Sequence, residues 1–171
     1  MEKVFLHKYV THCLQTFDYQ SRLLNPARSL HTRPAQLRGP IIVCVDTSGS
    51  MQGEPYSIAL SLMMKLSEVC GKERRRCYLV AFSVQATPID VLQDRTKLLN
   101  FFTRHPTGDT DARRMLATIF ALLHENPLYA GADVLWVTDF RIPLPPKNDL
   151  YQMQEVRKRG TRFYGLQIGI A

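Results

Sequence analysis

The sequence has 171 residues, 45% of them apolar and 22% charged, which suits one globular domain and excludes a disordered or collagen-like chain. Its 22 basic and 15 acidic side chains give a formal net charge of +7. This charge is compatible with nucleic acid or an acidic protein as a binding partner. The longest apolar run of membrane character, IALSLMM, is too short to span a bilayer, and the charged N-terminus does not read as a signal peptide, so we expect a cytoplasmic protein.

Two patterns precede the first predicted strand. Residues 4–17 place seven apolar side chains at helical spacing, which predicts an amphipathic helix. His7 and His12 fall five residues apart on its polar side, where solvated histidines are the expected state rather than metal ligands. Residues 20–38 contain two prolines and no periodicity, so residues 1–38 are expected to form a helix and a linker that crosses a surface.

From residue 39 onward, predicted strands alternate with predicted helices. We expect strands at 41–45, 76–83, 86–92, 133–139 and 162–170, and helices at 55–70, 94–104, 111–125 and 148–160. The first strand is apolar throughout, as in strands buried on both faces, and Pro88 marks 86–92 as an edge strand. The alternation predicts an α/β fold that is Rossmann-like, with a mostly parallel sheet, one short antiparallel edge strand and helices on both faces.

Polar side chains follow the strands of this predicted sheet. The strand VCVD ends on Asp46, and the strand WVTD ends on Asp139. A third segment, PTGDTD at 106–111, places Thr110 just before a helix, again on the carboxyl side of the sheet. Because ligands of open α/β sheets bind outside the carboxyl ends of the strands, we expect these residues to converge.

The converging residues form an all-oxygen set that suits a hard divalent cation. The set comprises two carboxylates and three hydroxyls: Asp46, Asp139, Ser48, Ser50 and Thr110. Oxygen ligands favour Mg²⁺, with Mn²⁺ or Ca²⁺ as alternatives. We expect Gly49 to bend the turn so that Ser48 and Ser50 point the same way. In a purely structural alternative, Asp46 caps a helix and the serines are ordinary turn residues.

The same residues resemble a known motif. Asp46, Ser48 and Ser50 match the D-x-S-x-S pattern of the von Willebrand factor type A (VWA) domain and its metal-ion-dependent adhesion site (MIDAS). Thr110 and Asp139 match the two later ligands of that site in the same order. The segments RGPIIVCVDTSGSM, RRCYLVAFS and VTDF are similar to the bacterial ViaA and CoxE-like proteins within that family.

The resemblance covers residues 39–170 and carries expectations about function. It implies that Ser48, Ser50 and Thr110 are direct ligands, while the two carboxylates often act through water. It further implies a protein-binding adaptor rather than an enzyme, in which an Asp or Glu of the partner completes the coordination of the cation. The expected partner is a MoxR-type AAA+ ATPase.

The sequence departs from the family pattern in three places. Asp109 stands where ViaA-like proteins usually have a second glycine before the threonine. Only about forty residues precede the domain, and the chain stops at Ala171. We therefore expect residues 39–171 to form a VWA domain without its usual C-terminal helix, and hypothesise that residues 4–17 cover the sheet surface that this helix would cover.

Charged residues flank the predicted site. Asp109, Asp111, Arg113 and Arg114 are candidates for contacts with a partner near the metal, and Arg104 lies on the same side. Two further basic groups follow helices at the opposite end of the sheet, where they complement helix C-termini: Lys72, Arg74, Arg75 and Arg76, and Arg157, Lys158 and Arg159.

Three other functions have weaker support. A haloacid-dehalogenase-like phosphohydrolase also has a nucleophilic Asp after its first strand, but needs a second Asp where this chain has Ser48. Cys70 and Arg76 have the C-x5-R spacing of a cysteine phosphatase, although Cys70 falls in a predicted helix. Nucleic acid could bind the basic groups, but no aromatic platform accompanies them.

Cys44, inside the first strand, is expected to be a buried reduced thiol.

Overall fold

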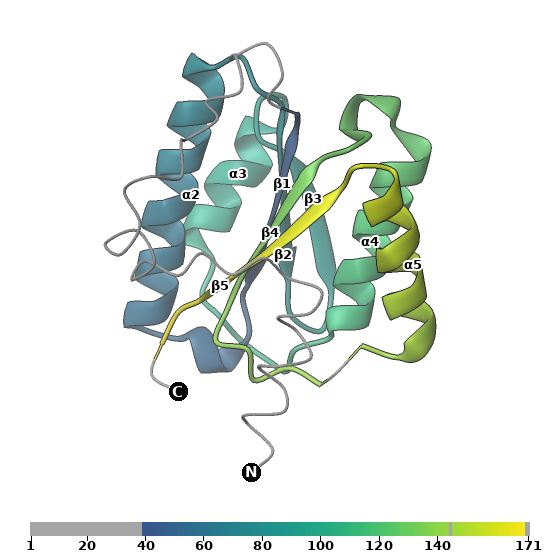
Figure 1. Cartoon of the computed structure of the whole chain (residues 1–171). Helices are drawn as coiled ribbons and strands as arrows, with labels where there is room; N and C mark the ends of the chain where they lie inside the picture. The colour runs from purple at the N-terminus through teal and green to yellow at the C-terminus, as the bar shows by residue number, and fades with distance from the viewer. Residues whose placement is uncertain (1–38, 144, 170–171) are drawn as a thin grey trace, which may run out of the picture.

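The computed structural model describes residues 39–143 and 145–169, which form a central sheet between two layers of helices (Figure 1). The helix predicted at 4–17 and the linker at 20–38 lie outside the described residues. The predicted α/β class is confirmed by the sheet and its order.

Five strands form the sheet in the order β3-β2-β1-β4-β5. Their bounds are β1 Ile41–Asp46, β2 Cys77–Phe82, β3 Ala86–Asp90, β4 Asp133–Thr138 and β5 Arg162–Gln167. β3 pairs antiparallel with β2, and Pro88 lies opposite Val80 in this edge strand, as predicted. The other pairs are parallel, so their carboxyl ends meet at one edge of the sheet. From β1 the chain continues to β2 and β3 on one side, and β4 and β5 are added on the other side. The strand order therefore reverses between β1 and β4, and ligands of such sheets bind at this point.

Helices cover both faces of the sheet (Figure 1). On one side lie α2 (Glu54–Lys72) and α3 (Arg95–Thr103), and on the other lie α4 (Ala112–Glu125) and α5 (Lys147–Lys158). Two 3₁₀ turns, η3 (Gly49–Met51) and η4 (Pro127–Tyr129), precede α2 and β4. These bounds are close to the predicted ones, and the largest difference is at β5, which ends at Gln167. No helix in the described ranges is both long and apolar enough to cross a membrane.

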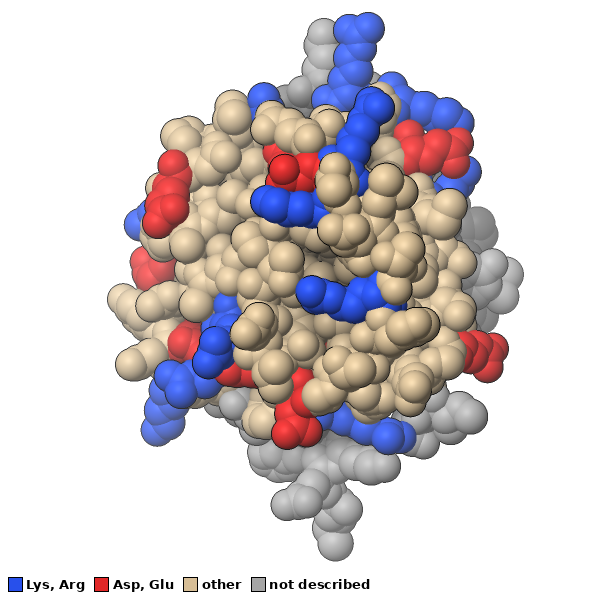
Figure 2. Space-filling view, turned by 180° about the vertical axis from the view of Figure 1, so that it is seen from behind, with Lys and Arg blue, Asp and Glu red and all other residues tan. Residues whose placement is uncertain are grey.

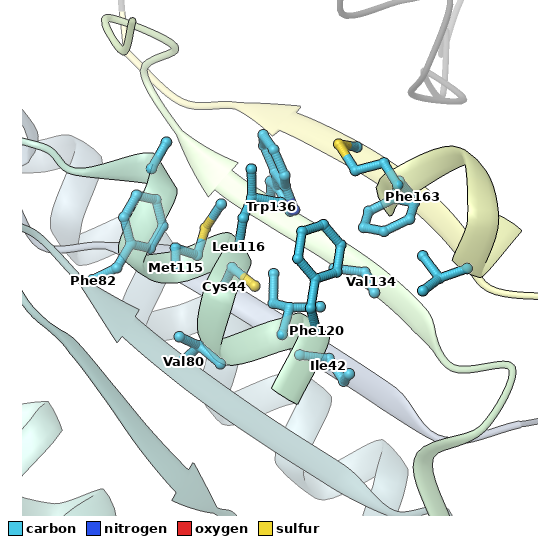
Figure 3. Packing of buried hydrophobic residues seen from close by; sticks show 14 of the residues in the cluster. Ile42, Cys44, Val80, Phe82, Met115, Leu116, Phe120, Val134, Trp136 and Phe163 are labelled. Carbon is cyan, nitrogen blue, oxygen red and sulfur yellow. The ribbon is translucent and has the colours of Figure 1, made fainter. Parts of the chain in front are cut away.

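The strand β1 supplies side chains to both hydrophobic cores of the domain. Ile42 and Cys44 belong to the cluster beneath α4 and α5, whereas Val43 and Val45 belong to the cluster beneath α2 and α3. Figure 3 shows the first cluster, in which side chains of α4 lie against those of the central strands. A strand buried on both faces needs apolar residues at every position, which explains the run that precedes Asp46.

An ion-pair network joins the segments at the opposite edge of the sheet, where the strands begin. The carboxylate of Asp133, the first residue of β4, accepts from Arg75 at 2.7 Å and from Arg162 at 2.8 Å. The Arg75 side chain also donates to the carbonyl of Gly39, just before β1. Arg75 and Asp133 have side chains only 16% exposed, so this pair holds three chain segments together rather than presenting free charge.

We expect Leu116→Ala, in the centre of α4, to lower the free energy of unfolding by about 2–5 kcal/mol, because it leaves a cavity in a fully buried position. The matched control is Leu99→Ala in α3, where the side chain is 65% exposed. That substitution should change the free energy of unfolding by no more than about 0.5 kcal/mol. Urea unfolding followed by circular dichroism measures both. Equal effects would contradict the assignment of Leu116 to the core.

Candidate metal centre

The loop after β1 is anchored to the end of β2. The backbone N–H and the hydroxyl of Thr47 both donate to the carbonyl of Phe82, at 2.8 and 3.0 Å. The side chain of Asp46 is fully buried, and its Oδ1 accepts from the backbone N–H of Ser48 at 2.9 Å. The carboxylate therefore lies beneath its own loop, and it holds that loop in position.

Ser48 and Ser50 bring their hydroxyl oxygens to 3.1 Å from each other. Ser48 is buried and Ser50 is exposed, so the pair extends from the buried region around Asp46 to the solvent. The expected bend at Gly49 is supplied by the 3₁₀ turn η3 rather than by a left-handed glycine, since Gly49 has no positive φ. Gly53, with φ 87°, takes that conformation before α2.

Thr138 is a functional candidate that the sequence reasoning missed. Its hydroxyl donates to Oδ2 of Asp46 at 2.6 Å, so both oxygens of this carboxylate accept hydrogen bonds within the protein. The parallel register pairs Val45 with Val137, which places the next residues, Asp46 and Thr138, side by side. The available signal was the threonine before Asp139 in WVTD, which becomes informative only when the register is known.

Asp139 lies at the end of β4 with a side chain only 7% exposed. Its Oδ1 accepts from the backbone N–H of Arg141 at 3.0 Å, and its Oδ2 lies 3.6 Å from Nε of Arg141. Phe140 between them has φ 58°, a left-handed conformation that is unfavourable for an aromatic residue. Such strain persists only where surrounding contacts impose it, and here the N–H of Phe140 donates to the Thr138 hydroxyl at 3.2 Å.

The loop at 106–111 is bonded through its backbone to the loop after β1. The N–H of Thr107 donates to the carbonyl of Thr47, and the N–H of Gly49 donates to the carbonyl of Gly108, both at 2.9 Å. Thr110, partly buried, follows in this loop directly before the cap of α4. The structure thus brings the Thr110 loop against the serine loop, while Asp46, Ser48 and Ser50 are linked more closely by their own hydrogen bonds.

The substitution at Asp109 does not require a glycine-like backbone. Gly108 has φ 78° and supplies the left-handed residue of this loop. Among the described non-glycine residues, only Arg74 and Phe140 have positive φ, so Asp109 takes an ordinary conformation. Its side chain is exposed to solvent.

The other flanking charges have structural partners. Asp111 caps α4, accepting from the N–H groups of Arg113 and Arg114 at 3.0 and 3.3 Å. Its second oxygen pairs with Nε of Arg114 at 3.1 Å, and Arg113 lies 3.9 Å from Asp149. Both arginine side chains remain largely exposed.

Burial raises the pKa of Asp46, and the nearby charge of Asp139 adds to this shift. The hydrogen bonds from Thr138 and Ser48 lower the pKa of Asp46 but do not cancel the effect of burial. An ionised Asp46 is therefore electrostatically unfavourable in the protein alone. A cation near both carboxylates would relieve this cost.

The donor set fits a hard divalent cation only if hydroxyl groups take part. Within the described residues, no group of three or more His, Cys, Asp or Glu side chains could hold a metal ion. The hydroxyl pair does have suitable spacing: adjacent ligands of an octahedral Mg²⁺ at about 2.0–2.1 Å lie about 2.9 Å apart. The observed 3.1 Å between the Ser48 and Ser50 oxygens is close to that separation.

Comparison with known families agrees with this architecture. The model of the family described as "VWA domain containing CoxE-like protein" matches residues 7–168. The chain belongs to this family. The match begins well before β1, so most of the N-terminal segment is part of the family's shared sequence.

Known relatives and structures of VWA proteins support the assignment. The chain is 29% identical over 153 residues to the regulatory protein ViaA of Edwardsiella ictaluri (strain 93-146), covering 86% of this chain and 31% of that protein. It is also 29% identical over 164 residues to the regulatory protein ViaA of Proteus mirabilis (strain HI4320), covering 92% and 33%. The chain therefore spans about a third of these relatives' length.

Among solved structures, a von Willebrand factor type A protein from Catenulispora acidiphila has a TM-score of 0.51 at 17% identity. The superposition covers 77% of this chain and 33% of that one. At this identity the likeness concerns the fold, and it confirms the predicted VWA architecture.

We expect the stability of the wild-type domain relative to Asp46→Asn to fall as the pH rises from acid to neutral, when EDTA removes divalent cations. Because burial raises the folded pKa of Asp46 above its ordinary value of 3.8, the ionised side chain destabilises the fold above the folded pKa. This penalty is lost as the pH falls through the folded pKa, so the wild type should gain stability relative to the variant in acid. Urea unfolding at a series of pH values measures the difference, and one that is independent of pH would contradict the prediction.

Proposed function

We propose that this VWA domain is a metal-dependent adaptor that binds an acidic segment of a protein partner. The cation is Mg²⁺, or Mn²⁺ or Ca²⁺ in its place, and its site is formed by Asp46, Ser48, Ser50, Thr110 and Asp139. The hydroxyl groups bind the cation directly, the two carboxylates balance its charge, and an Asp or Glu of the partner takes a remaining position.

One observation carries this proposal: two serine hydroxyls lie 3.1 Å apart above a fully buried carboxylate. Burial raises the pKa of Asp46, and a cation beside this carboxylate would lower the free-energy cost of keeping it ionised. Hydroxyl ligands are neutral, so the atoms that bind the cation directly do not cancel its positive charge. An anionic side chain from a partner is therefore a favourable additional ligand.

The proposed partner is a MoxR-type AAA+ ATPase, and the proposed role is regulatory rather than enzymatic. Support comes from the relatives named regulatory protein ViaA, which match this chain over a third of their length. The ATPase is proposed as the partner because the site resembles that of the ViaA and CoxE-like proteins. Nothing in the proposed mechanism requires the domain to make or break a covalent bond.

Positive charge beside the site supports an acidic partner. Arg113, Arg114 and Arg141 have side chains that are 63–75% exposed, and Arg104 is exposed as well. Arg141 pairs with Asp139 of the proposed site, and the other arginines can attract a carboxylate to the carboxyl edge of the sheet.

The alternative function, binding of nucleic acid by the basic groups, has less support than binding of an acidic protein partner. Part of the basic group after α2 is engaged internally, because Arg75 is paired with Asp133. On the face shown in Figure 2, basic side chains lie singly or in small groups among uncharged and acidic ones. A continuous basic stripe, which would follow a phosphate backbone, is not visible on that face.

We expect Mg²⁺ to raise the melting temperature of the wild-type domain, and EDTA to reverse the rise. A ligand at 100 times its Kd stabilises the folded state by about 2.7 kcal/mol. The double variant Ser48→Ala, Ser50→Ala should lose most of this response because it lacks the paired hydroxyl ligands. Differential scanning fluorimetry with and without Mg²⁺ measures the shift.

The matched control is the double variant Ser57→Ala, Ser61→Ala in α2. Both serines are exposed, and their hydroxyls donate to carbonyls of the preceding turn, at 3.2 and 2.9 Å. This control should respond to Mg²⁺ as the wild type does. If both double variants respond equally, Mg²⁺ binds elsewhere and the proposed site is wrong.

We expect immobilised domain to retain a MoxR-type ATPase from the same organism in Mg²⁺ but not in EDTA. The Ser48→Ala, Ser50→Ala variant should fail to retain it, while the Ser57→Ala, Ser61→Ala control should succeed. Circular dichroism of each variant checks that it is folded. Retention that depends on neither the cation nor the serines would place the interface away from the proposed metal centre.

A further inference from the structure

The described residues contain a pair of cysteines that the proposed metal centre does not use. Cys70 lies near the end of α2, and Cys77 is the first residue of β2. Both are free thiols, and both belong to the buried cluster beneath α2 and α3. This position in a helix also shows why Cys70 does not form the phosphatase loop considered from its spacing to Arg76.

A tight turn brings the two cysteines together. The N–H of Arg75 donates to the carbonyl of Cys70 at 2.8 Å, and Arg74 takes the left-handed conformation with φ 52°. This arrangement closes the end of α2 in the manner of a Schellman turn and reverses the chain into β2. As a result, the thiols of Cys70 and Cys77 share a side-chain hydrogen bond.

We infer that Cys70 and Cys77 form a reversible dithiol–disulfide couple that is oxidised by hydrogen peroxide. The sulfur of Cys70 attacks one oxygen of the peroxide, the O–O bond breaks, and Cys70 becomes a sulfenic acid as one water leaves. The sulfur of Cys77 then attacks the sulfur of Cys70, forming the S–S bond, and the S–O bond breaks to release a second water. Two thiols are oxidised and one peroxide is reduced to two waters.

The environments of the two thiols assign these roles. The hydrogen bond from Cys77 and the charge of Arg75 lower the pKa of Cys70, which favours its thiolate. Cys77 is paired with Ile41 in the sheet, so it opens less readily than the end of α2 and acts as the second, resolving thiol. By contrast, burial alone raises the pKa of Cys44 in the middle of β1.

Access to the pair requires only a local opening. Cys70 is 2% exposed, but α2 ends two residues later at Lys72, and the ends of helices open at less cost than the centre of a sheet. Cys44 is fully buried in a central strand and has no such route. The pair should therefore react before Cys44 does.

The disulfide can be detected directly because trypsin cleaves between the two cysteines. Complete cleavage of the reduced protein gives separate peptides, residues 66–72 with Cys70 and residues 77–95 with Cys77. After hydrogen peroxide treatment of the folded protein, blocking of free thiols and digestion, we expect both peptides in one species, lighter than their sum by two hydrogens. Mass spectrometry measures this species, and dithiothreitol should separate it.

Matched variants and conditions define the outcome. Cys77→Ala and Cys70→Ala should each abolish the linked species, whereas Cys13→Ser should leave it unchanged. The inference is overturned if the folded wild type yields only unlinked peptides, or if the link joins Cys13 or Cys44 instead.

Discussion

The carboxylate of Asp46 is the feature on which the candidate site depends. It is fully buried at the end of β1, where Oδ1 accepts from the Ser48 N–H and Oδ2 from the Thr138 hydroxyl. These two bonds determine the position of the serine loop and connect it to β4 across the point where the strand order reverses. The same bonds make burial of the charge tolerable without removing its cost.

The surrounding fold supplies what this carboxylate requires. β1 is covered by α4 and α5 on one face and by α2 and α3 on the other, so the end of the strand is held between two packed cores. The loops after β1 and β2 are tied by the two bonds from Thr47 to Phe82. The Thr110 loop is tied to the first of these by bonds from Thr107 and Gly49. Three loops that are distant in sequence thus share one rigid base, which is the arrangement that precise ligand positioning needs.

The candidate site contains groups that lower the stability of the fold, whereas the opposite edge of the sheet contains contacts that raise it. The raised pKa of Asp46 and the left-handed Phe140 are local costs next to the proposed cation position. At the edge where the strands begin, Asp133 pairs with Arg75 and Arg162, and a closed turn joins α2 to β2. That edge contributes stability, and it also places the thiols of Cys70 and Cys77 in contact.

The order of amino acids was enough to predict the helices, the strands and the polar residues at the strand ends. Apolar runs that stop at Asp46 and Asp139 indicated parallel strands with polar ends, and Pro88 marked the edge, because these features depend on local burial and backbone geometry. The role of Thr138 depended on the register between β1 and β4, which no local pattern encodes. The ordinary backbone at Gly49 and Asp109, and the pairing of Arg75 with Asp133, were likewise decided only by contacts between distant segments. The sequence gives the type of each side chain, but the hydrogen-bond partner of that side chain depends on which segments the folded sheet brings together.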